Sequence, residues 1–250
     1  MAKPYAAQAI IFDLDGTLVD SAEDLRAALN VLFGDLGLRA IEAGEIKAMI
    51  GDGVLKLVER GLVAANADPA RKDALLPRYL EIYQANPTTL TRCYPGVAET
   101  LKLLQQRDFR LAVVTNKPAA ATKQILEALS LSAFFPVVIG GDSLPKRKPD
   151  PAQLIEAARQ LGVDVDQTLM VGDNIHDVQA ARAAGMRCIA VSYGYHHRPP
   201  AEFNADRVID RFDELASLVI NSTSNRSEGG RDPGLVSPTH PLSSGPERLA

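Results

Sequence analysis

The chain has 250 residues, of which 46% are hydrophobic and 23% are charged, and its formal net charge is -4. This length supports one large domain, or one domain with an insertion, around a substantial apolar core. The slightly acidic balance provides no basic surface for nucleic acid or for an anionic membrane, so the expected partner is a small molecule.

The N-terminal segment leads directly into the first predicted strand. Residues 9–12 are apolar, and Asp13 ends the run. Such a short run predicts a buried strand rather than a signal peptide, and no apolar run approaches the roughly 20 residues of a membrane span. We therefore expect a soluble cytoplasmic protein in which Cys93 and Cys188 are reduced thiols.

The next segment, residues 20–90, lacks comparable strand patterns and is rich in Leu and Ala at helical spacing. We expect its first helix to begin at Ser21, which forms a capping-box pattern with Asp24. Four leucines continue along one face of that helix, as core packing requires: Leu25, Leu29, Leu32 and Leu36. The segment therefore predicts an inserted helical unit.

Beyond this segment, short β-branched runs alternate with helical stretches. The runs occupy residues 111–114, 137–139, 169–171 and 188–191. This alternation predicts parallel strands joined by crossover helices, so the expected fold class is α/β. From residue 221 the chain becomes rich in Ser, Gly and Pro, which predicts a disordered tail over 221–250.

Three of the predicted strands lead into polar side chains that suit phosphate chemistry, namely Asp13, Thr115 and Asp173. Ligands of open α/β sheets bind beyond the carboxyl ends of the strands, so these residues should converge. Asp13 could attack phosphorus and form an aspartyl phosphate. Asp15, two residues later, could protonate the leaving oxygen and then deprotonate the incoming water.

Further groups complete this phosphate site. Thr115, with Asn116 beyond it, and the fixed positive charge of Lys148 could hold the transferring phosphoryl group. A phosphate dianion beside carboxylates such as Asp173 and Asp177 would be self-repelling without a cation. A hard divalent ion is therefore needed, and Mg²⁺ suits a set of oxygen ligands.

Together these residues resemble the four motifs of the haloacid dehalogenase superfamily across residues 7–217. The matching stretches are 13–17, 115–116, 148 and 172–177. The resemblance implies that Asp13 is both nucleophile and metal ligand, and that Asp15 is the acid/base. It also implies that the backbone carbonyl of Asp15 and the carboxylate of Asp173 bind Mg²⁺, while Asp177 supports the water shell of the metal.

The same resemblance implies a Rossmann-like parallel-sheet core, formed by residues 7–19 and 91–217, with an inserted helical cap at 20–90 that closes over the substrate. Three further stretches are similar to those of phosphoglycolate phosphatases, at 50–53, 140–143 and 191–195. This similarity points to 2-phosphoglycolate as the substrate, hydrolysed to glycolate and phosphate.

Two residues depart from the family pattern. Asn174 stands where the family often has Ser, and Asp52 stands where phosphoglycolate phosphatases commonly have Asn. An acid near an anionic substrate is unfavourable, so Asp52 must be turned away or paired.

We interpret His196 and His197 as polar loop residues rather than metal ligands, and Arg60 as a surface charge.

Other functions remain open on these motifs. Asp15 argues against a dehalogenase, which has no leaving oxygen to protonate. A sugar-phosphate mutase retains both acids, and a nucleotidase or pyrophosphatase shares the motifs. A noncatalytic phosphate sensor would be expected to lack Asp13, Asp15 or Lys148. We expect a monomer or homodimer that acts with Mg²⁺ on a small phosphorylated substrate.

Overall fold

A six-stranded parallel sheet forms the centre of the computed structural model, which describes residues 7–223. In spatial order the strands are β5 (Val137–Ile139), β4 (Arg110–Val114), β1 (Ala9–Phe12), β6 (Thr168–Gly172), β7 (Arg187–Val191) and β8 (Arg207–Ile209). Every neighbouring pair is parallel. The predicted α/β class is confirmed, and the three-residue edge strand β8 is the one member of this sheet that the sequence did not indicate.

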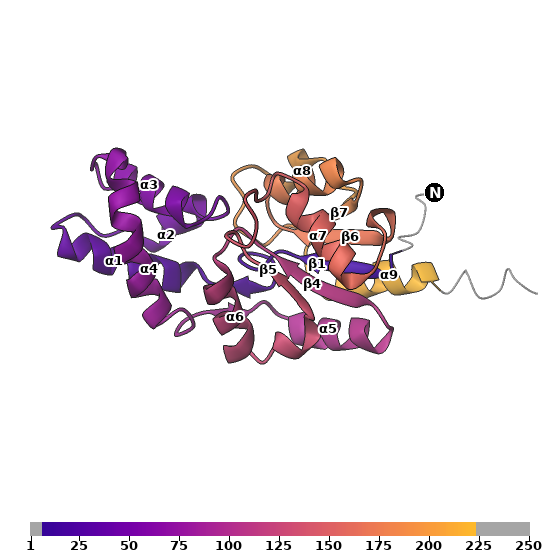
Figure 1. Cartoon of the computed structure of the whole chain (residues 1–250). Coiled ribbons are helices and arrows are strands. Elements are labelled where there is room, and N and C mark those ends of the chain that lie inside the picture. Colours follow the sequence, from indigo (N-terminus) through magenta and orange to yellow (C-terminus); the bar gives the residue numbers. More distant parts are fainter. Residues whose placement is uncertain (1–6, 224–250) are drawn as a thin grey trace, which may run out of the picture.

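Helices cover both faces of the sheet (Figure 1). Ile10 and Phe12 of β1 point into the core on one face. That face is covered by α5 (Val97–Gln106), α6 (Ala119–Ala128) and α9 (Glu214–Thr223). Ala9 and Ile11 point into the opposite core. That face is covered by α7 (Ala152–Leu161) and α8 (Ile175–Ala184).

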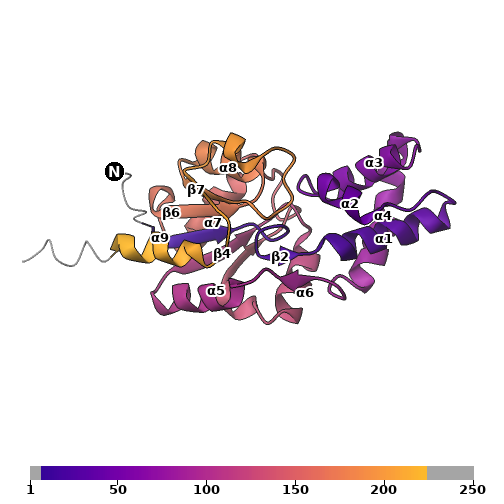
Figure 2. The same cartoon turned by 180° about the vertical axis from the view of Figure 1, so that it is seen from behind.

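Four helices form a second lobe, set apart from the sheet in Figures 1 and 2. They are α1 (Ala22–Asp35), α2 (Ala43–Ile46), α3 (Val54–Ala64) and α4 (Lys72–Ala85). Three of the predicted core leucines of α1 are buried there and Leu36 packs against them, so the lobe has an apolar core of its own. Short 3-10 segments complete the chain: Lys47–Met49, Pro69–Arg71, Ser132–Phe134, Val165–Gln167 and Pro200–Phe203.

The chain crosses between the lobes twice, and the two crossings are paired as β2 (Val19–Asp20) and β3 (Arg92–Cys93) in a short antiparallel ladder. Asp24 accepts hydrogen bonds from the backbone of Leu90 and from both the backbone and hydroxyl of Thr91. The hydroxyl of Ser21 donates to Asp15 instead of capping α1. The predicted capping box is therefore wrong, because both side chains bind partners outside the helix.

The end of the described chain is helical. Helix α9 continues to Thr223, past residue 221 where the tail was predicted to begin, and residues 224–250 of that predicted tail lie outside the described part of the chain. Across the described residues, no helix is both long enough and apolar enough to cross a membrane.

Candidate active site

The carboxyl ends of the three central strands meet at one edge of the sheet. Asp13 follows β1, Thr115 follows β4 and Asp173 follows β6, and both β4 and β6 are neighbours of β1. The backbone N–H of Asp13 donates to the carbonyl of Val171 at 2.9 Å, which extends the ladder to the point where the side chains diverge. The topology thus brings together residues that lie up to 160 positions apart in the chain.

Lys148 reaches the same edge from the loop after β5. Its Nζ lies 2.9 Å from Oδ1 of Asp13 and 2.7 Å from Oδ1 of Asp177, and it donates to the carbonyl of Val114 at 2.8 Å. The side chain is buried. Although burial alone lowers the pKa of Lys148, Asp13 and Asp177 raise it above its usual value, so the ammonium group stays charged.

Three carboxylates gather beside this lysine. Asp13, Asp173 and Asp177 each offer an oxygen, and these oxygens all lie within 4.8 Å of one another. Asp173 accepts from the hydroxyl of Thr17 at 3.1 Å and from the backbone of Tyr195 at 2.6 Å. These contacts fix the orientation of Asp173, and the cluster has the oxygen chemistry that a hard divalent cation requires.

The N-terminus of α8 positions Asp177. Asn174 caps this helix by accepting from the backbone of His176 at 3.2 Å, and Asp177 accepts from the backbone of Asn174 at 3.0 Å. The two residues form a reciprocal capping box. Asn174 therefore has a clear local role, and Asp177 is held against Lys148.

Burial, together with neighbouring negative charge, raises the pKa values of Asp13 and Asp173 in this cluster. Burial raises the pKa of Asp13 to about 6, and repulsion from Asp177 and Asp15 adds to the effect of burial while Lys148 opposes it. Burial, together with Asp13 and Asp177, also raises the pKa of Asp173 well above its usual value. A bound cation would relieve both the repulsion and the cost of burying these charges.

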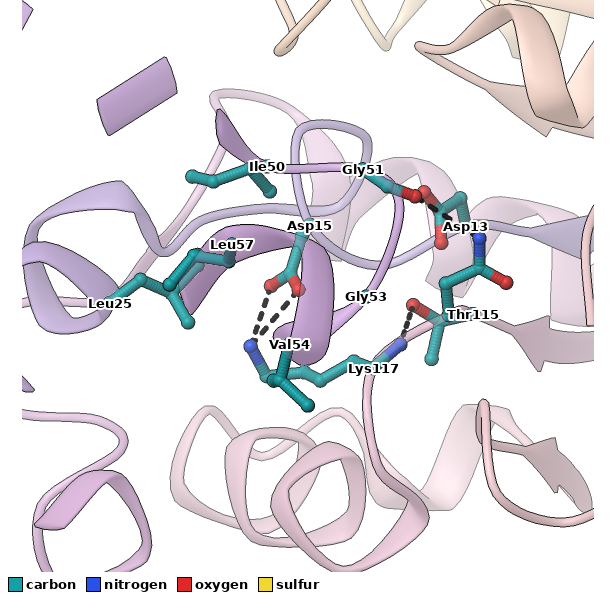
Figure 3. Close-up of a pocket in the computed structure, with 11 residues that line it drawn as sticks. Asp13, Asp15, Leu25, Ile50, Gly51, Gly53, Val54, Leu57, Thr115 and Lys117 are labelled. Atoms are coloured by element: carbon teal, nitrogen blue, oxygen red, sulfur yellow. Dashed lines mark hydrogen bonds and ion pairs between the residues drawn. The ribbon is translucent and has the colours of Figure 1, made fainter. Parts of the chain in front are cut away.

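Asp15 faces away from this cluster toward the helical lobe. Its Oδ1 accepts from the hydroxyl of Ser21 at 2.5 Å. Nζ of Lys117 lies 3.1 Å from Oδ1 and 3.0 Å from Oδ2, as the dashed lines in Figure 3 show. Gly16, which follows, has φ of +87° and lies so close to Asp173 that any side chain there would strike its carboxylate. Glycine at this position therefore lets the chain turn past the cluster.

A pocket lies between the two lobes and is lined by both (Figure 3). The sheet lobe contributes its polar floor: Asp13, Asp15, Thr115, Asn116 and Lys117. The helical lobe contributes apolar side chains and two glycines: Leu25, Ile50, Gly51, Gly53, Val54 and Leu57. The pocket thus has a charged side suited to phosphate and an apolar side that excludes water.

The side chain of Asn116 has structural partners within this site. Its Nδ2 donates to the carbonyls of Gly51 and Lys148, both at 3.1 Å. The amide therefore links the helical lobe to the loop that carries Lys148. The hydroxyl of Thr115 accepts from the backbone of Lys117 at 3.3 Å, and Thr115 lines the pocket.

Asp52 is paired, which is one of the two arrangements expected from the sequence. Its carboxylate lies 2.5 Å from Arg60 of the helical lobe, and 3.0 Å from His176 and 3.5 Å from His197 of the sheet lobe. Hydrogen bonds from both histidines, together with Arg60, hold the pKa of Asp52 well below its usual range. Arg60, interpreted from the sequence as a surface charge, is partly exposed and is paired with Asp52, and this ion-pair cluster joins the lobes.

Comparison with known proteins agrees with the resemblance seen in the four sequence motifs. A family model described as haloacid dehalogenase-like hydrolase matches residues 10–191. A phosphoglycolate phosphatase of Pseudomonas syringae pv. tomato is 46% identical over 206 residues, which cover 80% of this chain and 75% of the relative.

Two solved structures share the fold. The crystal structure of a predicted phosphoglycolate phosphatase from Haemophilus somnus superimposes with a TM-score of 0.80 at 32% identity, over 85% of this chain and 97% of that one. CbbY from Rhodobacter sphaeroides, crystallised in complex with phosphate, gives a TM-score of 0.70 at 27% identity, over 84% and 96% of the two chains.

Proposed function

Since the chain belongs to the haloacid dehalogenase-like hydrolase family, we propose that this phosphoric monoester hydrolase cleaves 2-phosphoglycolate with Mg²⁺ and an aspartyl-phosphate intermediate on Asp13. The observation that carries the proposal is the placement of Asp13. Its carboxylate lines the pocket, is 2.9 Å from the buried Lys148, and belongs to the acidic cluster. The names of the curated relatives support the choice of substrate.

The residues present fit a divalent cation. Four carboxylates, those of Asp13, Asp15, Asp173 and Asp177, face two ammonium groups at this edge of the sheet, so the fully ionised site carries two negative charges in excess. We assign Asp13, Asp173 and the backbone carbonyl of Asp15 as ligands, with Asp177 supporting the coordinated water. When bound, Mg²⁺ neutralises charge on the phosphoryl oxygens and orients them.

The reaction divides between the two acids of the first motif. A carboxylate oxygen of Asp13 attacks phosphorus, the ester P–O bond breaks, and Asp15 gives a proton to the departing glycolate oxygen. Asp15 then takes a proton from water. This water attacks the phosphorus of the aspartyl phosphate, the bond from phosphorus to Asp13 breaks, and phosphate leaves.

Other groups position the phosphoryl during both steps. Thr115 offers a hydroxyl at the pocket floor, and the fixed charge of Lys148 holds one oxygen of Asp13. Asn116 contributes by holding the loop of Lys148 against the helical lobe. We assign residues 7–19 and 91–217 as the catalytic core and 20–90 as a cap, whose apolar side chains exclude water from the pocket.

The proposal is tested by comparing kcat/KM for 2-phosphoglycolate, other small phosphorylated acids, sugar phosphates and nucleotides, with Mg²⁺ and with EDTA. We expect 2-phosphoglycolate to lead the sugar phosphates and nucleotides by at least about tenfold, since a site built around the polar groups of one substrate discriminates strongly against ligands that lack those groups. Replacing Asp13→Asn should lower kcat by more than about 10³-fold. EDTA should abolish turnover until Mg²⁺ is restored. A higher kcat/KM for a sugar phosphate or a nucleotide would contradict the assignment of 2-phosphoglycolate as the substrate. Isomerisation of a sugar phosphate without release of phosphate would indicate a mutase.

A further inference from the structure

Lys117 is a buried cation with no assigned role in phosphate transfer. Its side chain is almost fully enclosed, and its Nζ contacts both oxygens of Asp15 and lies 4.7 Å from the centroid of the Tyr83 ring. Among the described residues that line the pocket, Lys117 is the only lysine or arginine (Figure 3). It therefore supplies the positive charge of the pocket lining.

A buried ammonium group needs a counterion, because desolvation is costly and a contact with an aromatic ring repays only part of it. Within the described chain, the carboxylate that meets this need is Asp15. However, both oxygens of Asp15 are engaged, Oδ1 by Ser21 and Lys117 and Oδ2 by Lys117. Asp15 must release at least one of them before it can reach the ester oxygen of a substrate.

We propose that Lys117 binds the carboxylate of the substrate, which takes the place of Asp15 as its counterion and frees Asp15 for proton transfer. This inference rests on the proposed function and deepens it. The substrate class is an α-phosphoryloxy acid, in which one carbon separates the ester oxygen from the carboxylate. Asp15 gives its proton to the ester oxygen, and Lys117 contacts Asp15. A substrate carboxylate that is only one carbon from the ester oxygen is therefore brought to Lys117.

Other cations near the pocket fit this role less well. Arg60 is paired with Asp52, and Lys148 is paired with Asp13 and Asp177. Arg147 lies close to Gly53 at the edge of the pocket, but its side chain is exposed to solvent. An exposed guanidinium discriminates weakly between charged and neutral ligands, whereas a buried ammonium discriminates strongly. Arg147 therefore provides a matched control.

The first test compares kcat/KM for 2-phosphoglycolate and for its neutral amide, 2-phosphoglycolamide, in wild type, Lys117→Gln, Lys117→Arg and Arg147→Gln. We expect wild type to prefer the acid by about 30-fold or more, from the strength of a charged hydrogen bond. Lys117→Gln should reduce this preference to below about fivefold, while Lys117→Arg and Arg147→Gln retain most of it. Equal losses on both substrates in Lys117→Gln, or loss of preference in Arg147→Gln instead, would overturn the assignment.

A second test does not depend on the folding of a Lys117 variant. It measures inhibition by 3-phosphonopropionate, a non-hydrolysable analogue of 2-phosphoglycolate, and by propylphosphonate, which lacks the carboxylate. In wild type we expect the acid to bind about tenfold more tightly or better. In Asp15→Asn the inhibition constant of the acid should fall further, because the competing carboxylate is gone, while that of propylphosphonate changes little. Equal inhibition by both compounds would overturn the inference.

These outcomes are separable from failure of the proposed function. A wild-type enzyme that hydrolyses sugar phosphates or nucleotides but not 2-phosphoglycolate would refute the proposed substrate itself. A wild-type enzyme that hydrolyses 2-phosphoglycolate and its amide equally well would leave the phosphatase assignment intact and refute only the role of Lys117.

Discussion

The Asp13→Asn substitution should stabilise the metal-free protein at neutral pH, even though it removes the nucleophile. Burial and neighbouring acids raise the pKa of Asp13 from 3.8 to about 6. A raised pKa means that the folded protein binds this proton more tightly than the unfolded chain. The contribution of Asp13 to the free energy of unfolding is therefore fully present below about pH 4 and is lost as the pH rises through about 6.

The size of the effect follows from the shift. Two pKa units at 1.36 kcal/mol each give about 3 kcal/mol of folding free energy lost between pH 4 and pH 7. For a chain of this size, that corresponds to roughly 6–12 °C in Tm. Asn does not titrate, so the Asp13→Asn variant should lack this loss and become the more stable protein at pH 7.5.

The assay is thermal unfolding of wild type and Asp13→Asn in EDTA from pH 4 to pH 7.5. Asp73→Asn is the control, because Asp73 is an exposed residue of α4. Added Mg²⁺ should raise the Tm of wild type more at pH 7.5 than at pH 5, since the cation and the proton compete for Asp13. A Tm difference between wild type and Asp13→Asn that stays constant with pH, or a less stable variant at pH 7.5, would refute this electrostatic reasoning.

Three further substitutions probe the groups that hold the site together. Lys148→Met should lower the free energy of unfolding by about 3–5 kcal/mol in urea titrations, because it leaves two buried carboxylates without their shared cation. Asp52→Ala should cost about 1–2 kcal/mol and lower kcat/KM, because it removes the ion pairs that join the lobes. Asp24→Ala should cost about 1–3 kcal/mol in the same titrations, because it removes the acceptor of the backbone N–H groups of Leu90 and Thr91. If the free energy of unfolding of any of these three variants equals that of wild type, the stabilising role assigned to the contact removed in that variant is contradicted.

The sequence was most informative where chemistry and strand pattern coincide. Each of the apolar runs that were expected to be strands lies in the parallel sheet, and Asp13, Thr115 and Asp173 follow strands that are neighbours. A parallel sheet places the carboxyl ends of its strands at one edge, so local pattern alone was enough to bring these residues together. The edge strand β8 is three residues long, and an apolar pattern of that length cannot be distinguished from a loop.

The contacts between the lobes could not be predicted in this way. Lys117 follows the second motif directly, but its direction depends on Asp15 and on Tyr83 of α4, which tertiary packing brings to it. The capping box at Ser21 failed for the same reason, because its hydroxyl binds Asp15 across the turn. For Asp52, the sequence indicated that the acid must be turned away or paired, but it identified neither the arrangement nor the partners.

The most direct test of the central claim traps the covalent intermediate. In Asp15→Asn, p-nitrophenyl phosphate should still phosphorylate Asp13, because its leaving group needs no proton, whereas water attack lacks its base. We predict a burst of nitrophenolate close to one equivalent per active site, and one phosphoryl group on the peptide that contains Asp13 by mass spectrometry after an acid quench. Steady release of nitrophenolate with Asp13 unmodified, or a phosphoryl group on another residue, would contradict Asp13 as the nucleophile.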